Sequence, residues 1–300
     1  MKPSLLASYL KATLAMIFWA ATFVWIKIAY RWYQPIEVVF LRLVLATALL
    51  FLAILILRHK ERPARADILQ FMLVAFCEPF CYFLGEANGM MYVSSTLGSL
   101  IISTIPLFTA LGAWIFLREK ASGLLFLGLF ISFGGVALLA FSDANMWATL
   151  KGVLLMLVAV FGGMFYGITV RKLTLKYDTL TIVAWQSLFG MIYFLPLFLI
   201  LHGHTFFTMQ HSSEGLLTIA GLSVFASVGA FLLFTGVIRE LGVMRSNLFA
   251  NLIPVITSVL AFFVLGDQPT FRAVIGIVLV IIGLIISQYK DIRQVIIPAE

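Results

Sequence analysis

The stretch "STIPLFTALGAWIFLREK" (103–120) recurs 148 residues later as "NLIPVITSVLAFFVLGDQ" (251–268). The same register continues without a gap into the next apolar run. It is carried by four matched pairs: Pro106 with Pro254, Thr109 with Thr257, Gly128 with Gly276, and Gly135 with Gly283. A looser match aligns "PIEVVFLR" (35–42) with "TLTIVAWQ" (179–186) and places Arg42 opposite Gln186. We therefore expect two related halves, 1–145 and 146–300.

The composition of the chain indicates a membrane protein. Of 300 residues, 62% are hydrophobic and 11% charged, and the mean hydropathy is +1.09, which leaves too little polar surface for a water-soluble globule. Ten apolar runs are each long enough to cross a hydrocarbon core of about 30 Å: 10–30, 37–57, 67–87, 92–117, 122–141, 151–171, 178–201, 214–236, 243–265 and 272–289. Barrel strands would instead alternate over about 10 residues. The predicted fold is all-α, with ten transmembrane helices.

The number of spans in each half determines how the halves are related. Five is odd, so the two halves must enter the membrane in opposite directions. An inverted repeat is typical of secondary transporters, which place a site near the midplane between the halves and alternate access to it by rocking one half against the other. The predicted architecture is two inverted five-helix repeats.

The basic residues are distributed unequally between the two sides of the membrane. One side carries Lys27, Arg31, Lys151 and Arg272. The opposite side carries Lys2, Lys11, Arg58, Lys60, Arg62, Arg65, Arg118, Lys120, Arg171, Lys172, Lys176, Arg239, Arg245, Lys290 and Arg293. This bias predicts a multi-pass protein of the inner or plasma membrane with both termini in the cytoplasm. The net charge of +7 then indicates contact with lipid headgroups rather than with nucleic acid.

Several motifs resemble the EamA-like drug/metabolite transporter superfamily over essentially the whole chain. They are "FWAATFVWIK" (18–27), "FLR" (40–42), the run from "YFLGEANG" to "FLREK" (82–120), and the proline followed by an acidic end in span nine. The resemblance implies a ten-helix inverted-repeat fold with a central cavity formed mainly by spans one, three, four, six, eight and nine. It also implies outward transport of small organic solutes, often amino acids. The chain departs from the pattern in span one, where many members have Trp-Gly, and in span six, where "FGGMFY" contains no tryptophan.

Span three carries the most unusual residues for an apolar segment. Glu78 is about eleven residues into the run, roughly 16 Å along the helix axis, and so near the bilayer centre. A charged side chain there costs about 2.5–3.5 kcal/mol, which makes Glu78 a candidate for binding protons or substrate, although a carboxyl that only ties helices together is the alternative. Pro79 should bend the helix beside it. Tyr82 and Glu86 follow at helical spacing on the same face, with Phe83 packing elsewhere, and Glu86 either lines the outer path or is structural.

Lys27 and Arg42 are the cationic residues available to these acids. Lys27 is either a snorkelling residue at a helix end or part of an outer charge cluster with Glu37 and Glu86. Arg42 lies deeper, so a salt bridge or a contact with a carboxylate is expected there. Both are predicted to take part in gating or charge pairing.

Spans four and nine place polar residues ahead of matched prolines. Ser99 and Ser103 precede Pro106, and Asn247 and Asn251 precede Pro254. Such residues either bridge helices or face a polar substrate from two symmetry-related helices that loosen before their prolines.

Three aromatic residues lie well inside their spans rather than at headgroup level. We expect Trp19, Phe161 and Tyr166 to form walls of the cavity.

The remaining motifs narrow the function. No Walker A sequence is present, so the chain cannot couple transport to ATP by itself, and neither H-E-x-x-H nor G-x-S-x-G occurs. Cys77 and Cys81 are expected to pack rather than to form a disulfide or a metal site, and His202, His204 and His211 to be solvated loop residues. The leading hypothesis is a secondary transporter without cofactor or metal, driven by a gradient of protons or of the substrate itself. An intramembrane lipid-modifying enzyme and a non-transporting receptor are the alternatives.

Overall fold

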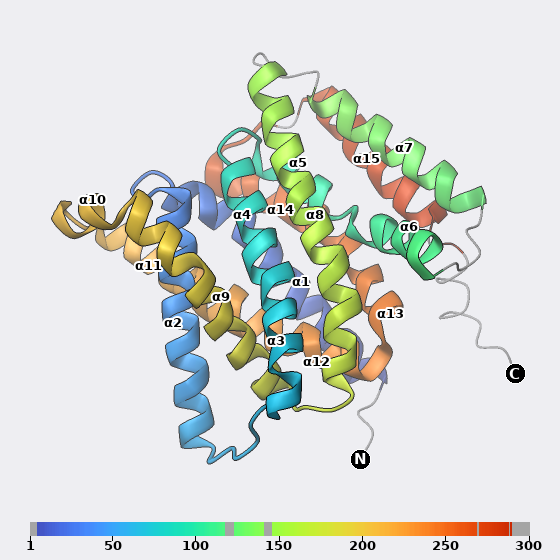
Figure 1. Ribbon diagram of the computed structural model, residues 1–300. Coiled ribbons are helices and arrows are strands. Elements are labelled where there is room, and N and C mark those ends of the chain that lie inside the picture. Colours follow the sequence, from blue (N-terminus) through green and yellow to red (C-terminus); the bar gives the residue numbers. More distant parts are fainter. Residues whose placement is uncertain (1–4, 118–122, 141–145, 269, 288, 290–300) are drawn as a thin grey trace, which may run out of the picture.

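The structure, a computed structural model, describes residues 5–117, 123–140, 146–268, 270–287 and 289. Helices make up the described part of the chain, which contains no strand (Figure 1). In the first half they are α1 (Leu5–Ala29), α2 (Pro35–Ile56), η1 (Arg65–Asp67), α3 (Ile68–Ala75), η2 (Phe76–Cys81), α4 (Tyr82–Gly89), α5 (Ser95–Ile102), α6 (Ile105–Leu117) and α7 (Gly123–Ala140). In the second half they are α8 (Met146–Thr174), α9 (Thr179–Leu201), α10 (Gly203–Thr208), α11 (Ser213–Gly221), η3 (Leu222–Ala230), α12 (Phe231–Leu241), α13 (Val243–Asn247), η4 (Leu248–Asn251), α14 (Leu252–Leu260), η5 (Ala261–Leu265) and α15 (Phe271–Ser287).

These elements account for the ten predicted spans. Seven helical stretches are long and apolar enough to cross a membrane: Leu5–Ala29, Pro35–Ile56, Arg65–Gly89, Thr149–Thr174, Thr179–Leu201, Ser213–Leu241 and Arg245–Leu265. Three shorter apolar helices supply the others: Ser95–Thr109, Phe126–Leu138 and Val274–Ile286. The prediction of an all-helical membrane protein with ten spans in two repeats is confirmed.

The start of α2 matches the start of α9 in the other half. Pro35 is the first residue of α2, where its missing N–H is of no consequence, and the backbone N–H of Gln34 donates to the Glu37 carboxylate at 2.8 Å. The first residue of α9 is Thr179, the repeat mate of Pro35, and Asp178 caps it by accepting from its N–H at 2.9 Å. Arg42 and Gln186 are consequently the eighth residues of their helices, and α2 and α9 lie side by side (Figure 1).

Spans four and nine are interrupted at equivalent places, as the sequence predicts. The chain leaves regular helix at Ser103 and Thr104, between α5 and α6, directly before Pro106. In the second half a 3₁₀ turn, η4, ends at Asn251, directly before the α14 segment that contains Pro254. A proline cannot donate the backbone hydrogen bond that would continue the preceding turn, so each break follows from its proline.

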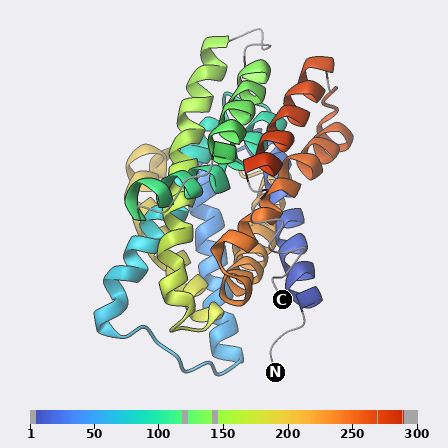
Figure 2. The same ribbon diagram turned by 90° about the vertical axis from the view of Figure 1, so that its right-hand side faces the viewer.

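The last helices of the two halves, α7 and α15, pack closely on each other along what we call the glycine seam (Gly128, Ser132, Gly135, Gly276, Val280 and Gly283; Figures 1 and 2). A Cβ on Gly135 would lie 2.7 Å from the Gly276 carbonyl oxygen. A Cβ on Gly283 would lie 2.6 Å from the Gly128 carbonyl oxygen, so the contacts are reciprocal. Small residues of this kind let membrane helices approach closely, and here they place matched positions of the two repeats against each other.

Candidate functional site

A partly open cavity lies between the two halves. Its walls come from spans one, two, three, four, six, eight and nine: Trp19, Thr22, Phe23, Arg42, Glu78, Tyr82, Phe83, Glu86, Ile102, Ile105, Pro106, Gly163, Tyr166, Gly167, Phe234, Asn247, Ala250 and Ile253. The cavity has a volume of about 70 Å³. This is several times the roughly 10–15 Å³ that one water molecule needs. The family resemblance implied six of these spans, and the seventh, span two, contributes Arg42.

The helix of span three is broken at Glu78. This residue has extended backbone angles (φ −148°, ψ 120°) inside the π-helical turns of η2, and the Glu78–Pro79 peptide bond is cis. The predicted bend beside Pro79 is therefore present. Glu78 is buried and lines the cavity, and irregular backbone at membrane depth is tolerated where it is enclosed by protein or lines a cavity.

A close approach of α8 holds the segment after the break in place. A Cβ on Gly162 would lie 2.8 Å from the Cys77 carbonyl oxygen and 2.9 Å from the Tyr82 backbone nitrogen. Only glycine allows this contact, so Gly162 fixes where Tyr82 stands. The Tyr82 hydroxyl donates to a carboxylate oxygen of Glu86 at 3.2 Å, and both side chains are buried. The predicted stripe of Glu78, Tyr82 and Glu86 thus faces one cavity.

Arg42 reaches the same cavity from α2. Its Nε donates to the Ser227 hydroxyl at 2.5 Å, and its guanidinium carbon lies 4.2 Å above the centre of the Phe83 ring. Sequence reasoning expected Phe83 to pack away from the acids; this was wrong, because Phe83 lines the cavity and supports Arg42. Phe83 directly follows Tyr82, and the chain around the helix break turns both toward the centre.

The aromatic wall agrees with the sequence analysis at two of three positions. Trp19 lies 4.8 Å from Phe234, ring centre to ring centre, and Tyr166 is buried with its hydroxyl 3.3 Å from the Thr235 hydroxyl. Phe161 was misplaced: it is 45% exposed and is not part of the cavity wall. Span six is apolar on all sides, so its sequence does not indicate which face turns inward.

The polar residues of spans four and nine are used unequally. Ser99 and Ser103 donate to carbonyl oxygens of their own helix at 2.8 and 2.7 Å, and neither is among the residues that line the cavity. Asn247 lines the cavity, whereas Asn251 is not among its lining residues. Of the two prolines, Pro106 lines the cavity.

Lys27 does not join an outer charge cluster. Its ammonium donates to the Met90 carbonyl oxygen at 2.5 Å, while Glu37 accepts from the backbone of Gln34. Of the two alternatives for Lys27, the charge cluster with Glu37 and Glu86 is therefore not formed, and the ammonium instead ties the end of span one to the end of span three.

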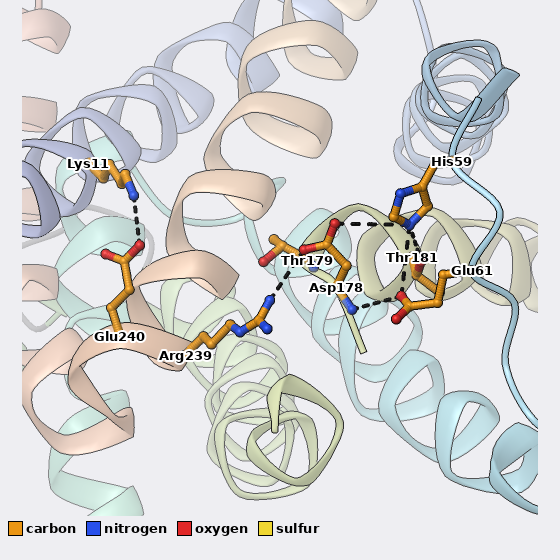
Figure 3. Close-up of polar contacts among 8 residues, drawn as sticks. All are labelled: Lys11, His59, Glu61, Asp178, Thr179, Thr181, Arg239 and Glu240. Atoms are coloured by element: carbon orange, nitrogen blue, oxygen red, sulfur yellow. Dashed lines mark hydrogen bonds and ion pairs between the residues drawn. The ribbon is translucent and has the colours of Figure 1, made fainter. Parts of the chain in front are cut away.

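A second group of polar residues gathers at the end of the molecule where α9 starts and α12 ends. We call it the inner network (Lys11, His59, Glu61, Asp178, Thr181, Arg239 and Glu240; Figure 3). Lys11 of α1 donates to Glu240 of α12 at 2.7 Å, and Arg239 lies 3.2 Å from the Asp178 carboxylate. His59 lies 2.9 Å from the Thr181 hydroxyl and 3.8 Å from Glu61. The network links α1, the loop that follows α2, the start of α9 and the end of α12, from both halves.

Sequence reasoning missed this network and part of the cavity. The signal for the network was present: Glu61, Asp178 and Glu240 are acids on the side that carries the basic residues. The signal for Ser227 was its spacing from Ser223, i and i+4 in an apolar span. Phe234 carried no signal, because 28 phenylalanines are spread over the chain. Among the described residues no group of three or more His, Cys, Asp or Glu side chains is arranged to hold a metal ion, and both cysteines are free.

Comparison with known proteins gives consistent results. Named relatives include an "Uncharacterized transporter" of Archaeoglobus fulgidus, 26% identical over 95% of this chain and 98% of that protein. A "Probable terminal-alkyne amino-acid exporter" of Streptantibioticus cattleyicolor is 25% identical over 94% of this chain and 93% of that protein. A solved crystal structure superimposes with a TM-score of 0.70 at 13% identity, over 94% of this chain and 98% of that one, which concerns the fold alone. The EamA-like transporter family matches residues 6–141 and again 150–289, so the protein belongs to this family.

Proposed function

We propose that the protein is a secondary transporter that exports small organic metabolites, amino acids or similar solutes, across the inner or plasma membrane by alternating access. The observation that carries the proposal is a partly open cavity lined by both halves that contains Glu78, Glu86 and Arg42. Buried ionisable groups that face a cavity in membrane proteins are typical of substrate and ion pathways. Family membership supports transport in general, and the exporter from Streptantibioticus cattleyicolor supports the outward direction and the solute class.

Glu78 is the residue we assign to coupling. It lies at the break in span three, it is buried, and among the described residues its carboxyl has no hydrogen-bond or ion-pair partner within bonding distance. Such a carboxyl can exchange a proton for the positively charged group of a substrate, since the charged form is costly to hold alone. A gradient of protons, or of the substrate itself, then drives the cycle.

The inner network is the contact we assign to closure on the cytoplasmic side. It joins α1 to α12 and α12 to the cap of α9, and the excess of basic residues on this side supports a cytoplasmic location. Opening on that side requires these pairs to separate. Exposed pairs of this kind are worth only about 0.2–1 kcal/mol each, so they can break during a transport cycle.

The test is flux from liposomes that contain the purified protein and are loaded with a mixture of amino acids and other metabolites. We expect efflux above that of protein-free liposomes, accelerated by an imposed pH gradient, and loss of the acceleration in Glu78→Gln. Glu214→Gln changes an exposed acid outside the cavity in the same way and should behave like the wild type. If the flux does not depend on the pH gradient, or if Glu78→Gln leaves the flux unchanged, proton coupling through Glu78 is contradicted. No flux for any solute contradicts the transporter assignment.

A further inference from the structure

Arg42 is held in a fixed orientation in the cavity wall. It is 1% exposed, its Nε is bound to Ser227, and its guanidinium carbon lies over the ring of Phe83. A guanidinium stacked on an aromatic ring and held by one hydrogen bond loses much of its freedom to turn. The two supports come from different halves, Phe83 from the first and Ser227 from the second.

The terminal nitrogens of Arg42 are available to a ligand. A guanidinium has five N–H donors, and Ser227 takes the one on Nε. No carboxylate oxygen of the described residues lies within 4.0 Å of its nitrogens, and no other described acceptor bonds to them. Glu86 and Glu78 attract Arg42 only from a longer distance. An arginine fork of this kind fits the two oxygens of a carboxylate.

The second half of the protein shows that the fold does not need this charge. Gln186 occupies the matching place, as the eighth residue of α9, and is buried to the same degree. A neutral amide therefore occupies the matching position, although its oxygen has no hydrogen-bond partner among the described residues. Burying a guanidinium is far more costly than burying an amide, so a role in packing does not explain Arg42.

We propose that Arg42 binds a carboxylate group of the transported solute, held in position by Ser227 and Phe83. This inference rests on the proposed function and specifies its substrate class: metabolites that carry a carboxylate beside an apolar body, which the wall of Trp19, Tyr166 and Phe234 contacts. An amino group on the same molecule is favoured, because it offers a positive charge to Glu78 and Glu86, which line the same cavity.

Matched compounds test the assignment by binding. Purified protein is titrated by calorimetry with two series that differ only in the charged groups: L-leucine, L-leucinamide, 3-methylbutylamine and 4-methylpentanoate, and the corresponding L-phenylalanine compounds. We expect at least one amino acid to bind, and its amide and amine to bind about 10- to 100-fold more weakly, as loss of a charge-assisted contact requires. An amide or amine that binds as well as its amino acid overturns the proposal, as does a lack of binding in both series.

Variants locate the effect at Arg42. Arg42→Gln installs the side chain that the second half carries and should remove the preference for the carboxylate. Arg42→Lys keeps the positive charge but lacks the two parallel donors of a guanidinium, so it should retain part of the preference for the carboxylate. This second variant tests the inference even if Arg42→Gln does not fold. Arg31→Gln makes the same change at an exposed position and should bind like the wild type. Unchanged preference in both Arg42 variants overturns the inference.

Flux measurements separate this inference from the proposed function. If the transporter assignment is right and the inference wrong, Arg42→Gln liposomes keep the selectivity of the wild type. If the compounds bind with the expected preference but none crosses the membrane, the transporter assignment fails while the carboxylate site stands.

Discussion

Gly162→Ala should destabilise the segment that carries Glu78. The added methyl group would lie 2.8 Å from the Cys77 carbonyl oxygen and 2.9 Å from the Tyr82 nitrogen. Both neighbours are backbone atoms that cannot rotate away, so η2 and α8 must separate by several tenths of an ångström. Overpacking of this kind costs about 1–3 kcal/mol. At about 2–4 °C per kcal/mol for a chain of this size, Tm should fall by roughly 2–12 °C.

The two cysteines of the chain provide the assay. Cys77 and Cys81 are both free and both belong to η2. A dye that fluoresces on reaction with thiols therefore reports the opening of this segment through Cys77, which is buried, when the purified protein is heated. Gly162→Ala should give an earlier rise of fluorescence than the wild type.

A matched control separates crowding from the general effect of alanine in a helix. Gly134 lies inside α7, and a Cβ there would meet no atom within 4 Å, so Gly134→Ala should not lower Tm. If Gly162→Ala melts at or above the wild-type temperature, the close approach of α8 to η2 is not what fixes Tyr82, and the reasoning is refuted.

Three further results are expected. Arg239→Ala breaks the exposed pair with Asp178, which is worth about 0.2–1 kcal/mol, so Tm should hardly change while amide hydrogen exchange in the first turn of α9 increases; unchanged exchange argues against the inner network. Gly283→Ala forces a methyl group to 2.6 Å from a carbonyl oxygen of α7 and should cost about 1–3 kcal/mol in the same thiol assay; a wild-type melting curve contradicts the glycine seam. The hydrogen bond from Lys176 to Asp67 raises the pKa of Lys176. The stabilisation from this hydrogen bond is then complete at pH values below the pKa of lysine in the unfolded chain, about 10.4, and is lost as the pH rises through the pKa of Lys176 in the folded protein. The difference in Tm between Lys176→Met and the wild type should therefore shrink at alkaline pH. A difference that does not change with pH argues against the pair.

Much of the helical architecture could be predicted from the sequence, because the features that determine it act locally along the chain. The breaks before Pro106 and Pro254 follow from the missing N–H of proline, and the duplicated pattern places them at matched positions. The position of Glu78 in the cavity could be predicted from its depth in an apolar run, because the bilayer fixes how far a residue lies from water.

The direction of single side chains could not be predicted where the helix is irregular or featureless. The 3.6-residue period assigns Phe83 to a different face of span three from Tyr82 and Glu86, but the cavity meets a wider arc of α4, so Phe83 also lines it and supports Arg42. Phe161 belongs to a span that is apolar all round, so no period shows which side meets lipid. The inner network depends on which spans are neighbours, and Lys11 and Glu240 become partners only through the tertiary fold.

The glycine seam also has a consequence for the order of assembly. A chain is made from its amino end at about 5–20 residues per second, and the residues that line the cavity run from Trp19 to Ile253. All of them have been synthesised before α15 (Phe271–Ser287), whose main partner is α7. Until then the glycine face of α7 lacks the partner that it has in the complete structure. Insertion of α15 therefore gives α7 its partner only after the cavity walls have been made, and a defect in α15 leaves α7 uncovered while the contacts of α2 with α9 and of α4 with α8 still join the two halves.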